Sequence, residues 1–274
     1  MNDQLFPALL KFWRARHGQS QLDLALTSGV SARHISFLET GRARPSVDMV
    51  LRLLAALDVP LRHQNEALRA AGFEALFPEP DLDAISPAID WALERMLQQQ
   101  EPYPLTLLAA DYRIVRRNGA ASRLFELFVQ EPAMAIEPLD MFSLLFEPGL
   151  ARPFVVEWEQ LARKMLARLH REMLHSGGDA RLATLFERAL RCPGVSALWR
   201  RPDLSTNIDS TLEVWLQRGD LRVGFMTTIT VFSAPRLVTL EELRIESYFP
   251  LDEATRHTCE RLAEASLRHL PVSD

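Results

Sequence analysis

The sequence predicts an α+β protein in which an all-helical N-terminal domain precedes a C-terminal domain that combines an antiparallel sheet with helices. The first observation is that apolar residues from Phe6 to Gly72 recur at helical spacing between N-cap and glycine signals. The second is that runs of alternating apolar residues stand on both sides of a helix-rich middle part after Tyr103. The length of 274 residues and the 47% of hydrophobic residues are sufficient for two cores.

Residues 20–41 predict two short helices joined by a tight turn. Ser20 is a favourable N-cap, and Asp23 stands where its side chain can complete a capping box. Gly29 follows where the turn requires a positive φ, and Ser31 caps the second helix. The second helix is expected to present a short polar outer face, which suits the major groove of DNA.

The same stretch carries the pattern S-Q-x-x-L-A-x-x-x-G-V-S-x-x-x-I-S-x-x-E-x-G across 22 residues, and the likeness continues through RARPS and DMVLRLLAALDV. It resembles the XRE-family, lambda-repressor-like helix-turn-helix. The resemblance implies a domain of five helices over residues 5–72 and sequence-specific binding to double-stranded operator DNA. We accordingly expect the DNA-binding domain to span residues 1–76.

The outer face of the second helix is expected to read bases. Arg33 can bridge O6 and N7 of guanine, and Phe37 can contact a thymine methyl group. For Arg33 the alternative is an ordinary solvated charge. The predicted DNA-binding residues are Gln21, Ser31, Ala32, Arg33, His34, Ser36, Phe37, Arg42 and Arg44.

Gln21, Arg42 and Arg44 are better suited to phosphate contacts that fix the register of the protein on DNA. Glu39 is expected to be structural, because a carboxylate that faces phosphate is repelled. The charge distribution agrees with this placement: residues 1–45 carry six Lys or Arg and three Asp or Glu, a net +3, whereas the whole chain is −5. We therefore expect DNA contact at one end of an acidic protein.

Composition also bounds the compartment and the chemistry. Cys192 and Cys259 show no metal or redox spacing, and the chain contains no membrane span or signal-peptide pattern, so a cytoplasmic protein without a cofactor or metal is predicted. His170 and His175 lie five residues apart, about 140° around a helix, and so cannot share a metal. Since no nucleophile motif or phosphate-binding loop occurs, the chain is predicted not to be an enzyme.

Residues 77–100 are expected to form a linker, FPEPDLD, and a connector helix over 86–100. Trp91 lies off the apolar stripe of that helix. It packs either on the adjacent domain or in the interface of a homodimer, and the pattern does not decide between them.

Residues 101–274 are expected to form the second domain. It should begin with two strands around a turn at Ala110-Asp111, followed by a helix capped by Asn118. Within the strand at 241–249, Leu243, Ile245 and Phe249 are expected to point inward, and Glu242, Arg244 and Glu246 outward. The further predicted elements are helices at 139–146, 153–175 and 179–190, a hairpin of 212–216 and 221–232 around Arg218-Gly219-Asp220, and a closing helix at 252–269.

This order of elements is compatible with a PAS-like sensor. The segments LDVPLRHQNEALRAAGF, EPYPLTLLAADYRIVRRNGAASRLF, SALWRRPDL and EELRIESYFPLDEAT also resemble the MmyB-like regulators. That resemblance implies a helix-turn-helix followed by a PAS-like ligand-binding domain, with a hydrophobic, fatty-acid-like effector.

Large apolar side chains in the second domain are candidates to line a ligand cavity. For each of them the alternative is that it packs in a filled core. Arg163 or Arg168 can supply the cation for an acidic effector. Two other functions stay open: a ligand-free dimerisation or partner-docking module, and a flavin or haem sensor. The predicted ligand-binding residues are Phe142, Phe154, Trp158, Met165, Trp215, Phe225 and Phe232.

Overall fold

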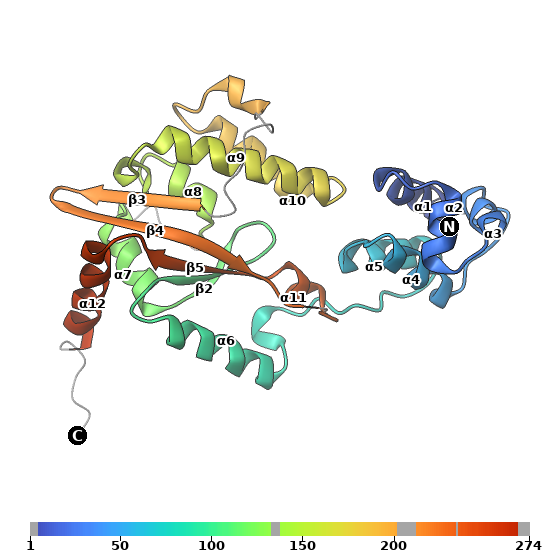
Figure 1. The fold of residues 1–274 in the computed structure, drawn as a ribbon, viewed down its shortest axis with the longest axis horizontal. Coiled ribbons are helices and arrows are strands. Elements are labelled where there is room, and N and C mark those ends of the chain that lie inside the picture. The colour runs from blue at the N-terminus through green and yellow to red at the C-terminus, as the bar shows by residue number, and fades with distance from the viewer. Residues whose placement is uncertain (1–4, 133–137, 202–211, 234, 268–274) are drawn as a thin grey trace. The chain divides into compact units, whose positions relative to one another are not determined.

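The computed structural model describes residues 5–132, 138–201, 212–233 and 235–267. The chain divides into two compact units, Met1–Pro80 with Phe232–Glu241, and Asp81–Val231 with Glu242–Asp274 (Figure 1). Two predicted features extend beyond the described residues: the end of the closing helix at 268–269 and the last three residues of SALWRRPDL.

The described part of residues 1–80 contains five helices. Ser20 and Asp23 form the predicted capping box, and Gly29 ends the second helix with φ of 70°. Leu24, Ile35 and Leu38 are fully buried, so the small core closes around the helix-turn-helix. The five helices are α1 (Leu5–Arg16), α2 (Gln21–Ser28), α3 (Ala32–Glu39), α4 (Val47–Ala56) and α5 (Leu61–Ala70).

Residues 232–241, which we call the strap, belong to the first compact unit although they follow the fourth strand of the chain. The strap contains most of α11 (Val238–Glu242). Val238 N–H donates to the Pro78 carbonyl at 2.9 Å, and the Thr239 hydroxyl donates to the Pro80 carbonyl at 2.6 Å. The strap, which is far from residues 78–80 in the sequence, is thus held to them by hydrogen bonds.

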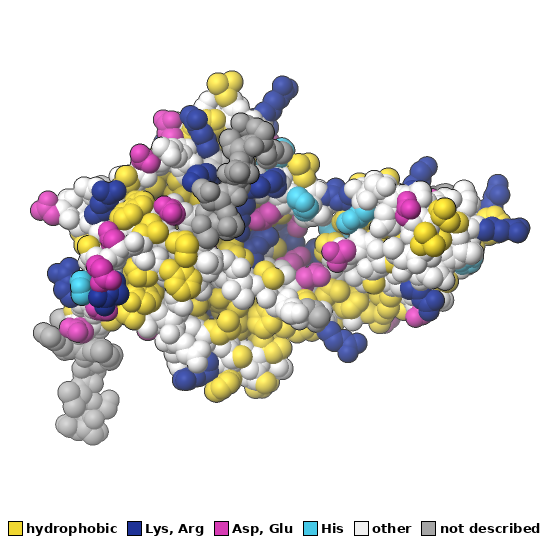
Figure 2. All heavy atoms as spheres, in the orientation of Figure 1, with side chains coloured by type: hydrophobic (Ala, Val, Ile, Leu, Met, Phe, Trp, Pro, Cys, Tyr) yellow, Lys and Arg dark blue, Asp and Glu magenta, His cyan; other side chains and the backbone are white. Residues whose placement is uncertain are grey.

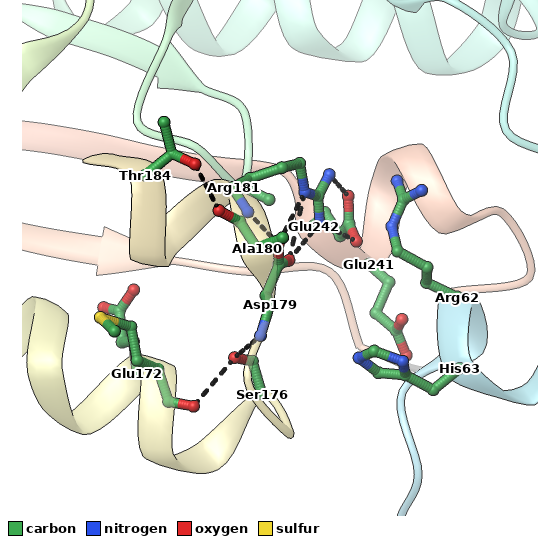
Figure 3. A network of polar contacts seen from close by, with 12 residues as sticks. Arg62, His63, Glu172, Ser176, Asp179, Ala180, Arg181, Thr184, Glu241 and Glu242 are labelled. Atoms are coloured by element: carbon green, nitrogen blue, oxygen red, sulfur yellow. Dashed lines mark hydrogen bonds and ion pairs between the residues drawn. The ribbon is translucent and has the colours of Figure 1, made fainter. Parts of the chain in front are cut away.

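The strap also caps a helix of the first unit. α5 follows Pro60, which makes no side-chain cap hydrogen bond. The Glu241 carboxylate takes that place, because its Oε2 accepts the Leu61 N–H at 2.8 Å. In Figure 3 the Glu241 side chain points toward α5, where His63 is drawn. A carboxylate at a helix N-terminus also interacts favourably with the helix dipole.

The second unit is built on a five-stranded sheet with the order β2-β1-β5-β4-β3, in which all neighbouring strands are antiparallel. The predicted hairpin is confirmed: Arg218 pairs with Leu221 across a two-residue turn, and Gly219 has the positive φ, 59°, that such a turn requires. The strands are β1 (Leu105–Leu108), β2 (Ile114–Arg117), β3 (Leu212–Arg218), β4 (Leu221–Thr230) and β5 (Arg244–Pro250).

The helices of this unit begin where the sequence provides caps. The side chains of Ser86, Asn118, Asp140 and Asp179 each accept a backbone N–H at the start of α6, α7, α8 and α10. α9 packs against β3, and α12 packs against β4 and β5. The helices are α6 (Pro87–Gln100), α7 (Gly119–Leu127), α8 (Met141–Phe146), α9 (Trp158–His175), α10 (Ala180–Arg191) and α12 (Glu253–Leu267), with 3-10 turns η1 (Leu82–Ala84), η3 (Arg152–Phe154) and η4 (Ala197–Arg200).

The last strand differs from its prediction in its bounds and in which of its side chains are buried. β5 begins at Arg244, because Glu241 and Glu242 belong to α11. Leu243 and Ile245 are buried as expected, but Glu246 is only 6% exposed and Phe249 is 39% exposed, so the facing predicted for these two side chains was wrong. The reason is that α8 and α9 cover the face of β5 on which Glu246 lies, so this side chain lines an internal cavity instead of meeting solvent. Alternation of polarity marks the solvent side only where one face is open to water.

Candidate DNA-binding surface and ligand cavity

The second helix of the helix-turn-helix, α3, presents the predicted reading face. The Ser31 side chain accepts the His34 N–H at 3.3 Å and so starts the helix. Arg33 is exposed and Phe37 is half-buried. The Arg33 guanidinium carbon lies 5.4 Å from the centre of the Phe37 ring. The two side chains therefore lie together on the outer side of α3, in cation–π contact.

The remaining predicted DNA contacts flank this pair. Ala32, His34 and Ser36 are half-buried on α3, whereas Ser31 precedes the helix and is exposed. Arg42 and Arg44 are exposed in the segment between α3 and α4. Lys and Arg side chains stand out from the surface of the N-terminal unit in Figure 2. The surface therefore offers cations beside a face that is able to enter a groove.

Glu39 ties three elements of this unit together. Arg14 donates to its two carboxylate oxygens, at 2.6 Å from Nε and 3.0 Å from Nη2, and Gln21 Nε2 donates to Oε2 at 2.8 Å. Burial raises the pKa of Glu39, but the hydrogen bonds from Arg14 and Gln21 outweigh it and hold that pKa below its ordinary value. Glu39 thus joins α3 to α1 and α2. The Gln21 side-chain amide is thus engaged within the unit.

The second unit contains a cavity between its helices and its sheet, with a free volume of about 60 Å³. Its walls come from α7, α8, α9 and the strands β3, β4 and β5. Most of the lining is apolar, contributed by Leu124, Phe125, Met141, Phe142, Leu144, Leu145, Ala151, Leu161, Met165, Leu212, Val214 and Leu216.

Two of the seven predicted ligand-binding residues, Phe142 and Met165, line this cavity. Phe154 lies outside it and packs edge-on against Phe128, with the ring centres 6.0 Å apart. Trp158 also lies outside, and its indole N–H donates to the Leu145 carbonyl at 2.6 Å. These two aromatic side chains stabilise the packing behind the cavity wall.

Trp215, Phe225 and Phe232 lie outside the cavity as well. Trp215 is on the opposite face of β3 from Val214 and Leu216 and covers Gly224 of β4, where an added Cβ would lie 2.4 Å from the indole ring. Phe225 is fully buried in the core, and Phe232 belongs to the strap. Strand alternation separates Trp215 from the cavity, and the end of β4 at Thr230 separates Phe232.

Five polar residues occupy one part of the lining: Tyr112, Arg168, Thr227, Glu246 and Tyr248. The Tyr248 hydroxyl donates to Glu246 Oε2 at 3.1 Å, and the Thr227 side chain also hydrogen-bonds to Glu246. Of the two arginines considered for an acidic effector, Arg168 lines the cavity. Arg163 has a side chain that is 61% exposed and lies near Trp199.

Glu172 of α9 holds these groups in place from behind. Its Oε1 accepts the Tyr112 hydroxyl at 2.7 Å and Arg168 Nε at 3.1 Å, and its Oε2 accepts Arg244 Nη2 at 2.9 Å. Arg244 also donates to the Ala110 carbonyl at 2.9 Å. The network thus joins α9 to the first residue of β5.

Burial raises the pKa of Glu246, and the opposing effects of Arg168, Tyr248, Thr227 and Arg244 do not cancel it. The pKa of Tyr248 is raised well above its ordinary value by burial and by the neighbouring Glu246 charge. Sequence reasoning missed Glu246, Thr227, Tyr112 and Tyr248. One available signal was that Arg244, Glu246 and Tyr248 alternate along a single strand and so share a face.

The described residues offer little support for a metal site or for a reactive cysteine. They contain no group of three His, Cys, Asp or Glu placed to hold a metal ion. Cys192 and Cys259 are free and buried, and burial raises the pKa of each thiol to about 11, which disfavours the reactive thiolate. None of the helices described is long and apolar enough to cross a membrane.

Comparison with known proteins agrees with this division of the chain. Residues 10–64 match a helix-turn-helix model, and residues 89–262 match the model described as "MmyB-like transcription regulator ligand binding domain". No curated protein matches. A solved structure, "Structure of an RNA-binding Light-Oxygen-Voltage Receptor", aligns with 97% of this chain and 63% of its own at 12% identity and a TM-score of 0.30. The chain thus spans less than two thirds of that receptor.

The two models correspond to the two resemblances seen in the sequence, and the second model covers more than half of the chain. The predicted resemblance is therefore confirmed. The chain belongs to the MmyB-like transcription regulators, in which a helix-turn-helix for DNA binding is joined to a ligand-binding domain.

Proposed function

We propose that this protein is a cytoplasmic transcription regulator that binds operator DNA as a homodimer and whose affinity for DNA is changed by a hydrophobic, fatty-acid-like effector. The observation that carries this proposal is the course of β4 and β5. These strands bring Thr227, Glu246 and Tyr248 into the cavity, and the segment that connects them is the strap. Glu241 of the strap caps α5 of the first unit.

An effector changes DNA affinity only if it binds the competent and incompetent states differently. Occupation of the cavity acts on β5 at Glu246, four residues from Glu242. Glu242 is held by Arg181 of α10 at 2.9 and 3.0 Å (Figure 3), and Arg244 is held by Glu172 of α9. A shift of α9 or β5 around an effector is therefore transmitted to the strap, and through Glu241 to α5.

The homodimer is proposed because one helix-turn-helix has a small interface with DNA. Two half-sites about one helical turn (~34 Å) apart supply the specificity that a single one lacks. Trp91 on α6 is 66% exposed, an unusual position for a tryptophan. Its exposure supports a role for α6 in the contact between two copies of the chain.

The PAS-like character of the second unit is proposed on its single antiparallel sheet and on the cavity next to α9. The apolar walls suit an alkyl chain, and Arg168 suits a carboxyl group. The free volume of about 60 Å³ is small beside the ~300–1,000 Å³ of drug-sized sites. A long chain therefore requires the walls to move, and such movement is what the strap would transmit.

Native mass spectrometry of the gently desalted protein tests the effector. We expect a co-purifying carboxylic acid, and a rise in the unfolding temperature across a series from butanoate to tetradecanoate, because a ligand that binds only the folded state stabilises it. Matched primary alcohols control for non-specific binding of alkyl chains. If no small mass co-purifies and no member of either series shifts the unfolding temperature, a ligand-free dimerisation module replaces this proposal.

Arg44→Ala is expected to weaken binding to all DNA sequences by a similar factor, because Arg44 is proposed to contact phosphate. The slope of log K against log salt concentration should become shallower by about 0.9, the value for one phosphate contact. The measurement is fluorescence anisotropy at several salt concentrations on operator and random duplexes. An unchanged slope would remove Arg44 from the phosphate contacts.

A further inference from the structure

The lining of the cavity contains a glutamate, Glu246, as well as the arginine Arg168. Glu246 is 6% exposed and lines the cavity. Among the described residues, the side chains that hydrogen-bond to it are those of Tyr248 and Thr227, and both are neutral. Arg168 lines the same cavity, and its Nε donates to Glu172 at 3.1 Å. Within the part of the chain that the structure describes, neither Nη group of Arg168 has a hydrogen-bond partner. The polar end thus offers donors from Arg168 beside a buried carboxyl group.

When Glu246 is ionised, the charges around it cancel before any effector binds. α9 contributes Arg168 and Glu172, and β5 contributes Arg244 and Glu246. The two tyrosines in contact with these groups, Tyr112 and Tyr248, are neutral, because burial raises the pKa of both. Two cations therefore face two carboxylates. An effector that entered as a carboxylate would leave one buried negative charge without a partner, and such a charge is costly in an apolar site.

Two carboxyl groups in one enclosed site cannot both stay ionised, and a single proton held between them removes the repulsion. We propose that the cavity takes a carboxylic-acid effector together with one proton from solvent, which the effector and Glu246 share while Arg168 donates to the effector. The proton stays bonded to one carboxyl oxygen and hydrogen-bonds to the other group, so the pair carries a charge of −1. This inference rests on the proposed function, since it concerns the same cavity and effector class.

A dependence of affinity on pH follows. The free effector is ionised at neutral pH, since an ordinary carboxyl group has a pKa near 4.3. Below the pKa of Glu246 in the free protein, Glu246 already holds the proton, and affinity for the acid is constant. Above that pKa each binding event takes up one proton, so the association constant falls about tenfold per pH unit. Burial raises the pKa of Glu246 and so moves this fall to a higher pH than an ordinary glutamate would give.

The test is a calorimetric titration of the intact protein with a saturated carboxylic acid and with the primary alcohol of the same chain length, from pH 6 to pH 10. We expect affinity for the acid to reach a slope of about −1 in log K per pH unit, and affinity for the alcohol to stay constant. Glu246→Gln mimics the protonated acid, so this variant should bind the acid with the low-pH affinity of the wild type throughout.

Constant affinity of the wild-type protein for the acid across this range would overturn the inference and leave the proposed function intact. The inference would also fail if Glu246→Gln kept the wild-type slope, or if a folded Glu246→Gln protein no longer bound the acid. The comparison of the acid with the alcohol uses the wild-type protein alone. It therefore tests the inference even if Glu246→Gln does not fold. If neither compound binds at any pH, the proposed effector class is overturned together with the inference.

Discussion

Replacing Arg33 by alanine is expected to reduce discrimination against the wrong base at one operator position by about 1–3 kcal/mol. Arg33 stands exposed on the outer side of α3, and its contact with Phe37 restricts the orientations of the guanidinium group. Because a bidentate contact with guanine is specific for that base, the loss should fall on a single base pair. The measurement is competition between an operator selected from random DNA and its single-base variants.

Arg52→Ala is the matched control for the loss of a positive charge. Arg52 lies on α4, where it pairs with Asp48 at 2.9 Å. Its replacement by alanine lowers the charge of the N-terminal unit by one, as Arg33→Ala does. We expect Arg52→Ala to leave base preferences unchanged. If Arg33→Ala discriminated among the operator variants as well as the wild type does, Arg33 would not be a base-reading residue.

Glu241→Ala is expected to disconnect the effector from DNA binding. The variant removes the carboxylate that accepts the Leu61 N–H and so releases the strap from the start of α5. The loss of a helix cap costs about 1 kcal/mol, which should lower the unfolding temperature only modestly. The ratio of operator affinities with and without the effector should fall toward one, whereas effector affinity, measured without DNA, should stay close to that of the wild type.

Glu241→Gln separates this coupling from a general loss of stability, because its amide oxygen still accepts a hydrogen bond from Leu61. We expect it to keep most of the wild-type ratio. Glu79→Ala is a second control, since Glu79 pairs with Arg62 in the same unit but lies outside the strap. Should Glu241→Ala respond to the effector as fully as the wild type does, the strap would not be the connection.

The helix-turn-helix was predictable because its signals are local. Capping by Ser20, Asp23 and Ser31 and the positive φ of Gly29 each depend on a few neighbouring residues, and the structure shows all of them. The β3–β4 hairpin is of the same kind, since its turn at Gly219 is defined within four residues. For such elements the sequence pattern and the local free energy agree.

The cavity was predictable only in part, because its lining depends on which strands are neighbours. Glu246 has the alternation of a half-exposed strand, and its burial follows from the helices α8 and α9 that cover this face of β5. Large aromatic side chains, in turn, mark apolar surroundings without distinguishing a wall from a filled core. Phe142 and Phe225 are both almost fully buried, yet only Phe142 lines the cavity.

The contact between the strap and α5 could not be predicted from the sequence, for a related reason. Residues 232–241 come shortly after the strand β4 in the sequence. Nothing in their spacing indicates that Glu241 caps a helix that begins 180 residues earlier in the chain. Pro60 was the one local sign, because α5 starts at a residue whose side chain cannot supply the cap. A helix start without its own cap indicates that a partner is needed, but not which one.

Linkage between the cavity and the operator can be measured in both directions on one sample. Operator affinity is determined by anisotropy with and without a saturating concentration of the carboxylic acid that binds most tightly, and acid affinity by calorimetry with and without operator. A regulator controlled by this cavity requires both affinities to change by the same factor, between roughly 5-fold and 150-fold for ordinary coupling energies. A factor of one in both directions, with the acid demonstrably bound, would contradict control of DNA binding by the cavity.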